Sequence, residues 1–245
     1  MEKLNIEIAG VSAGVVCSYP ENIEFLRDYK TDREPLFTVS PRRDDLERMQ
    51  ADFDRMDEAA GIPKHIRQEG FLENNAIHAM LAEKMTEHGV LLMHGSALCI
   101  DGEAIIFTAP SGTGKSTHSR LWREVFGERV FMINDDKPFL RFADDIVYAC
   151  GSPWNGKHHL GRNVCVPLKA IVSLERAEEN SIVPMSKADA FPVLIKQAYK
   201  SRDAASMRHI AALEKLLIDK VRFYKLSCNM EHDAAVTAYN TIFAP

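Results

Sequence analysis

Short runs of alternating and apolar residues open the chain. Residues 3–9 alternate polar and apolar side chains, and residues 14–19 form a second run of β-type composition. Both patterns predict strands. We expect a short helix over 20–29 and another strand over 36–40. Together these elements predict a small N-terminal α+β region.

Two longer segments then follow the helical period. Residues 41–61 read as a charged helix, with Ser40 as N-cap, Pro41 at the first helical position and Gly61 near its end. Its charge density is more typical of a solvated helix face than of a binding patch. Residues 71–89 form an amphipathic pattern ended by Gly89. The apolar stripe of this second helix consists of Ile77, Met80, Leu81 and Met85.

The pattern changes to strands after residue 89. Three apolar, β-rich runs cover residues 90–93, 96–100 and 103–108, and Asp101-Gly102 predicts a tight hairpin turn between the last two. We therefore divide the chain into a small N-terminal α+β region, 1–89, and a core domain, 90–245. Further along, the pattern predicts strands at 167–176 and 221–228 and helices at 203–220 and 232–243, which we interpret as scaffold.

Composition places the chain among ordinary globular proteins. Of its 245 residues, 46% are hydrophobic and 27% charged. A formal net charge of −5 disfavours a broad nucleic-acid surface but not local binding of a nucleotide. We see no signal-peptide pattern and no run long enough to span a membrane, so we expect no membrane partner and a cytoplasmic location. Five cysteines are spread singly, which predicts reduced, packed thiols rather than a disulfide framework.

The most informative segment is the loop from Ala109 to Thr117, which has the order strand, glycine-bearing loop, Lys-Ser, helix that a phosphate-binding P-loop requires. Its glycines let the backbone wrap an anion, while Lys115 neutralises phosphate charge and Ser116 offers a hydroxyl to Mg²⁺. Ala109 stands where the consensus has its first glycine. The residues predicted to bind a nucleoside triphosphate are Ser111, Gly112, Thr113, Gly114, Lys115, Ser116 and Thr117.

A second apolar run, 129–134, ends in the carboxylates Asp135 and Asp136. P-loop enzymes place a carboxylate that supports Mg²⁺ at the end of such a strand. Neighbouring side chains on an extended chain point to opposite sides, so one carboxylate could face the metal and the other an acceptor hydroxyl. An acidic turn without function is the alternative.

A second glycine-bearing loop covers residues 150–157 and carries Lys157. It could clamp a transferred phosphate, or it could be a plain surface loop anchored by Trp154. His158 and His159 follow it, but adjacent residues seldom share one metal ion. The guanine-reading Asn-Lys-x-Asp motif of GTPases and the Leu-Ser-Gly-Gly signature of ABC proteins are missing from the sequence.

The segment 93–138 resembles the catalytic domain of HPr kinase/phosphorylase, in the wider group that includes phosphoenolpyruvate carboxykinase. It has a His-Gly pair on a strand, a hairpin, the P-loop, one helix, and a strand ending in Asp-Asp. A looser similarity extends over about 90–240. The resemblance implies an α/β fold, with a mixed sheet and helices packed mainly on one side, and a tendency to form homo-oligomers.

The resemblance also implies roles for individual residues. Lys115 and Ser116 would bind ATP and Mg²⁺, Asp136 would be a metal-site carboxylate, Asp135 the catalytic base, and His94 a group facing the acceptor. The sequence GSPWNGK, residues 151–157, stands where the family has its glycine-rich signature. The family's catalytic arginine has no clear counterpart in this sequence, and Arg162 and Lys187 are the candidates to replace it.

These observations predict an ATP-dependent kinase that transfers the γ-phosphoryl group to a hydroxyl, with Ser or Thr of a small protein or peptide as the expected acceptor. Two alternatives stay open. One is a nucleotide-binding recognition or switch protein with little catalysis, and the other is a small-molecule kinase on the same scaffold.

Overall fold

The computed structural model describes residues 1–110 and 112–244. It separates into two compact units, Met1–Met85 and a second unit that begins at Thr86. Among the described residues, no helix combines the length and apolar character needed to cross a bilayer.

The first unit is built on a small sheet. Strands β1 (Glu2–Ile8) and β2 (Val11–Cys17) form an antiparallel hairpin, and β3 (Phe37–Val39) pairs with β2 in parallel. The turn between β1 and β2 contains Ala9 and Gly10, both at positive φ, which suits the twist of a two-residue hairpin. The strands predicted at 3–9, 14–19 and 36–40 are confirmed.

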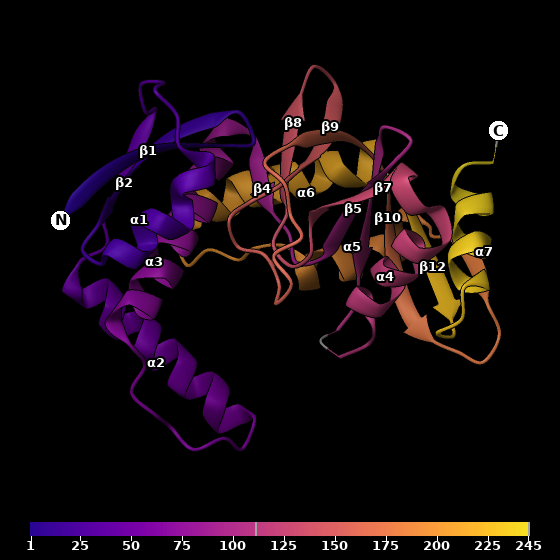
Figure 1. Cartoon of the computed structure of the whole chain (residues 1–245), viewed down its shortest axis with the longest axis horizontal. Coiled ribbons are helices and arrows are strands. Elements are labelled where there is room, and N and C mark those ends of the chain that lie inside the picture. Colours follow the sequence, from indigo (N-terminus) through magenta and orange to yellow (C-terminus); the bar gives the residue numbers. More distant parts are fainter. Residues whose placement is uncertain (111, 245) are drawn as a thin grey trace. The chain divides into compact units, whose positions relative to one another are not determined.

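Helices complete the first unit: α1 (Pro20–Leu26), the 3₁₀ turn η1 (Arg27–Tyr29), α2 (Arg43–Ala59) and α3 (Glu69–Met85). In Figure 1, α2 and α3 lie against one another. Glu73 of α3 is buried and accepts hydrogen bonds from the Ser18 and Tyr19 amides at 2.7 and 3.2 Å. It thereby supplies acceptors to backbone donors at the start of α1, a helix whose own N-cap side chain makes no capping bond.

The second unit contains a large mixed sheet, in the order β4-β8-β9-β10-β6-β5-β7, with β12 also paired to β10 and β11 to β12. Its strands are β4 (Val90–Leu92), β5 (Ser96–Ile100), β6 (Glu103–Thr108), β7 (Val130–Asn134), β8 (Phe139–Ala143), β9 (Ile146–Cys150), β10 (Cys165–Arg176), β11 (Ser181–Pro184) and β12 (Arg222–Cys228). The long strand β10 runs parallel to β6 and β12 and antiparallel to β9. The carboxyl ends of β6, β10 and β12 therefore lie at one edge.

Helices cover both faces of this sheet. They are α4 (Lys115–Phe126), α5 (Lys187–Gln197), α6 (Ala204–Lys220) and α7 (Asp233–Ile242), with 3₁₀ turns η2 (Thr86–His88) and η3 (Gly127–Arg129). Along β6, Ile105 and Phe107 pack with α4 and α7, while Ala104 and Ile106 pack with α5 and α6. Figure 1 shows α4 beside α7.

The α/β class and the mixed sheet are confirmed, but the expected placement of the helices mainly on one side is not. The physical reason is visible along β6, where both alternating sets of side chains are apolar and buried. A strand that is apolar on both faces needs cover on both. Strands β8, β9 and β11 and helix α5 were not among the predicted elements.

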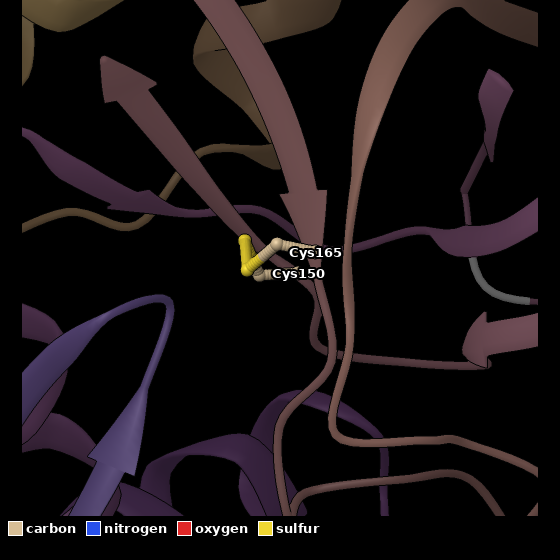
Figure 2. The surroundings of a disulfide bond; sticks show 2 residues. All are labelled: Cys150 and Cys165. Carbon is tan, nitrogen blue, oxygen red and sulfur yellow. A yellow bond between two sulfur atoms is a disulfide. The ribbon is translucent and has the colours of Figure 1, made fainter. Parts of the chain in front are cut away.

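The cysteine prediction is wrong for one pair. Cys150, at the end of β9, and Cys165, at the start of β10, form a disulfide (Figure 2). They face each other in the antiparallel register of these two strands. Cys17, Cys99 and Cys228, also within the described chain, are free thiols. The positions of the five cysteines in the sequence could not reveal this pair, because the register of β9 and β10 places Cys150 opposite Cys165.

Candidate functional site

The loop after β6 turns sharply into α4. Gly112 and Gly114 have φ values of +76° and +123°, which side-chain-bearing residues rarely adopt. A Cβ at either position would meet no atom within 4 Å, so conformation rather than space requires glycine. Helix α4 begins at Lys115, directly after Gly114. The predicted strand, loop and helix are thus present in order, whereas Ser111 lies outside the described residues.

Lys115 folds back over this loop. Its Nζ donates a hydrogen bond to the carbonyl of the buried Ala109 at 2.9 Å. Burial lowers the pKa of the Lys115 ammonium, the charge of Asp136 opposes this shift, and the neighbouring Lys137 adds to it. The ammonium group is therefore partly desolvated, and an anion at this position would interact with it more strongly than in bulk water.

A buried asparagine shapes the turn after β7. The Asn134 side-chain oxygen accepts hydrogen bonds from the Asp136 and Lys137 amides at 2.8 and 2.6 Å. Its amide nitrogen donates to Ser152 Oγ at 3.0 Å and to the Trp154 carbonyl at 3.3 Å. Asn134 therefore fixes the position of the paired aspartates relative to the loop that follows β9.

The two aspartates have different surroundings. Asp136 lies 3.3 Å from His94 Nε2 and 3.8 Å from Lys137 Nζ. Burial acts to raise the pKa of Asp136, but the hydrogen bond from His94 and the nearby positive charges of Lys137 and Lys115 outweigh it and hold the pKa below its ordinary value. The structure therefore brings His94 to Asp136, and this carboxylate stays ionised near neutral pH.

Asp135 instead faces the loop between β9 and β10. Its Oδ1 accepts a hydrogen bond from the amide of Gly156. A Cβ at Gly156 would lie 2.8 Å from Asp135 Oδ2, so a larger residue here would displace the carboxylate from this loop. The second glycine-bearing loop is thus a direct partner of the predicted base.

Two cavities flank the start of α4. The smaller cavity has a volume of about 180 Å³, and its lining includes Ser116, Asp135, Arg120, Arg123 and His158. Thr117 lines both cavities. The predicted metal hydroxyl and the predicted base therefore share one cavity.

The larger cavity measures about 540 Å³ and is bounded by Gly112, Thr113 and Gly114 on one side. Leu121, Leu174 and Met230 give it an apolar lining, and Asn229 and Arg176 add polar groups. Arg176, the last residue of β10, donates from Nε to the Thr113 carbonyl at 3.2 Å and from Nη2 to the Gly112 carbonyl.

The two basic residues suggested as a catalytic arginine's counterpart lie elsewhere. Lys187 pairs with Asp219 at 2.7 Å, close to the start of β12 and therefore at the opposite edge of the sheet from the loop after β6. The Arg162 guanidinium lies 4.6 Å from the centre of the Phe131 ring. Among the described residues, neither lines the two cavities beside α4.

Sequence reasoning missed Asn134, Arg120, Arg123 and Arg176. A signal for Arg176 was available, since the parallel strands of an α/β sheet place their carboxyl ends at one edge. Arg120 and Arg123 lie at helical spacing from Ser116, on the same side of α4. The role of Asn134 depends on contacts 18 and 20 residues away.

No family model and no curated protein matches the chain. Among solved structures, it is similar to the Hpr(Ser) kinase/phosphatase from Coxiella burnetii. The TM-score is 0.34 and the sequence identity 11%, over 61% of this chain and 95% of the other.

Within the described part of the chain, no group of three or more His, Cys, Asp or Glu side chains is arranged to hold a metal ion. Mg²⁺ bound together with a nucleotide needs only one or two protein oxygens, because phosphates and water complete its octahedron. The hydroxyl of Ser116 and the ionised carboxylate of Asp136 are hard oxygen donors of the type Mg²⁺ prefers. The donor chemistry therefore fits this ion.

Proposed function

We propose that the protein is an ATP-dependent phosphotransferase that moves the γ-phosphoryl group of ATP to a hydroxyl. The observation that carries the proposal is the pair of cavities that flank the start of α4, directly after the glycine-bearing loop. The larger cavity has the size and mixed lining of a site for a ribose and base. The smaller contains a carboxylate that can accept a proton.

Nucleotide binding would use the loop backbone first. Amides at the start of α4 point toward the loop, and the helix dipole favours negative charge there. Lys115 would leave the Ala109 carbonyl and bind the β- and γ-phosphates. Ser116 and Asp136 would hold Mg²⁺, which when bound neutralises phosphate charge.

Transfer would use Asp135. An acceptor hydroxyl in the smaller cavity would give its proton to Asp135 while its oxygen bonds to the γ-phosphorus. The bond from that phosphorus to the bridging oxygen breaks, and ADP leaves with the electron pair. Lys115 would stabilise the charge that develops on the phosphates. His94 would keep Asp136 ionised through the contact between the two side chains.

We propose a hydroxyl of Ser or Thr on a small protein or peptide as the acceptor. We also propose the cytoplasm, where ATP is abundant, as the place of action, where the Cys150–Cys165 disulfide would have to withstand reducing conditions. The same assay separates the alternatives. Incubation with γ-labelled ATP and lysate of the source organism would label a protein band in the first case and a metabolite in the case of a small-molecule kinase. Binding of ATP without transfer would indicate a nucleotide-dependent switch.

Asp135→Asn tests the base assignment. We expect transfer to fall at least about 100-fold, because the amide cannot take the acceptor proton. Nucleotide affinity should change little, since Asp135 is not part of the loop after β6. Asp144→Asn is a matched control, because Asp144 is exposed in the β8–β9 turn. Near-normal transfer by Asp135→Asn would reject the assignment.

A further inference from the structure

Arginines outnumber carboxylates in the lining of the smaller cavity. Ser116, Ser119, Arg120 and Arg123 line it from α4, at the spacing of one helix face. Asp135, which follows β7, and His158, in the loop after β9, also line it. Two guanidinium groups thus accompany one lining carboxylate, and Gly156 already donates a hydrogen bond to that carboxylate.

Arg123 has a hydrogen-bond donor without an acceptor in the described part of the chain. Its Nε is buried and has no hydrogen-bond partner among the described residues. Leaving a buried donor of a charged group unpaired is costly, and an anion in the cavity would bring a compensating charge to the same guanidinium. Arg120, by contrast, donates from Nη1 to Glu124 at 2.8 Å on the exposed side of the helix.

The nucleotide phosphates would lie nearer the start of α4 than Arg123 does. Arg123 follows Ser116 by two helical turns, which corresponds to about 10 Å along the axis of α4. A phosphate held by the loop and Ser116 would lie at the first turn. An anion bound at Arg123 itself would then belong to a second molecule in this cavity, which Asp135 also lines.

We propose that the acceptor carries a carboxylate or phosphate within a few bonds of its reacting hydroxyl, and that Arg123, assisted by Arg120, binds this group. This inference rests on the proposed phosphotransferase function. A cavity of about 180 Å³ admits a small molecule or a short segment of a peptide or protein. Arg123 thus selects acceptors by charge, while Asp135 acts on the hydroxyl.

The test is a set of calorimetric titrations with the full chain, first saturated with Mg²⁺ and the non-hydrolysable analogue AMP-PNP so that the phosphate loop is filled. The probes are glycolate, glycerol phosphate and ethylene glycol, which carry a hydroxyl with a carboxylate, with a phosphate, and with no charge. We expect at least one anionic probe to bind and ethylene glycol not to. Arg123→Leu should weaken that binding by at least about tenfold.

Two variants control this result. Arg208→Leu removes an exposed guanidinium from α6 and should leave probe affinity unchanged. Arg123→Gln keeps a polar side chain and serves if the leucine variant does not fold. Tighter binding of glycolate or of glycerol phosphate identifies the preferred anionic group.

The inference is overturned if neither anionic probe binds, if ethylene glycol binds equally well, or if affinity survives the loss of the Arg123 charge. Failure of the proposed function appears separately, as absence of AMP-PNP binding in the first step. If the probes bind in a way that depends on Arg123 but AMP-PNP does not bind, the anion site is supported and the phosphotransferase proposal is overturned.

Discussion

His118, on the buried side of α4, is held as a neutral imidazole. Its Nε2 accepts a hydrogen bond from Trp122 Nε1 at 3.0 Å, and its ring lies 4.7 Å from that of Phe107, edge on. Burial lowers its pKa to about 4, because the charged form loses its hydration. The stability of α4, the helix that follows the glycine-bearing loop, therefore depends on pH through this residue.

We expect His118 to make the fold acid-sensitive. In the unfolded chain His118 is protonated near pH 6.5, whereas in the folded protein it is protonated only near pH 4. The contribution of the neutral imidazole to the free energy of unfolding is therefore complete above pH 6.5 and is lost as the pH falls to about 4. It amounts to roughly 3 kcal/mol. His118→Gln keeps an acceptor for Trp122 but cannot titrate. Urea unfolding at pH 7 and pH 4.5 should therefore show a smaller pH effect in the variant, and equal pH effects would contradict the account.

Single residues also show how far the sequence could be interpreted. Lys115 and Asp135 could be named as candidates because each stands at a recognisable position, Lys115 at the start of a predicted helix and Asp135 at the end of a predicted strand. Asn134 stands in the same stretch, yet its function lies in contacts to Ser152 and Trp154, which no local pattern indicates. The aspartates diverge within the turn after β7, with Asp136 toward His94 and Asp135 toward Gly156, rather than by simple alternation along a strand.

At the scale of elements, the loop between β9 and β10 is closed by the disulfide at its base (Figure 2). Hydrogen bonds from Gly151 to the Val164 carbonyl and from Arg162 to the Ile133 carbonyl fix its ends beside the sheet. The cross-link and these bonds restrict the part of the chain that brings Gly156 to Asp135.

We expect the double variant Cys150→Ala, Cys165→Ser to unfold more easily than the oxidised protein. The two cysteines are separated by 15 residues, and closing a loop of this length in the unfolded chain stabilises a fold by about 3 kcal/mol in the chain-entropy description. Denaturant unfolding should show a lower midpoint. A reducing agent should lower the midpoint of the wild type but not that of the variant. An unchanged midpoint in the variant would mean that the cross-link does not constrain the unfolded chain.

The hairpin of β5 and β6 was predictable because Asp101-Gly102 combines a turn signal with flanking apolar runs. The Cys150–Cys165 pair was not, since it depends on the register of two strands on either side of a long loop. The helices on both faces were also missed, because the expectation came from the family resemblance rather than from the apolar pattern of β6 itself.

For the molecule as a whole, sheet direction is what assembles the site. Strands β6 and β10 run parallel, so the loop after β6 and Arg176 at the end of β10 meet at one edge, while α4 carries Ser116 and the two arginines into the cavity beside Asp135. The net charge of −5 does not exclude binding of an anion here, because the positively charged side chains are concentrated around the start of α4.

The most direct test of the account is calorimetric titration of Mg-ATP into the wild type, Lys115→Ala and Lys215→Ala, the last removing an exposed lysine of α6. We predict binding by the wild type and by Lys215→Ala. Lys115→Ala should bind at least about tenfold more weakly, because it loses one charge-assisted contact to phosphate. No Mg-ATP binding by the wild type, or equal affinity in Lys115→Ala, would contradict the assignment of residues 109–117 as a phosphate-binding loop.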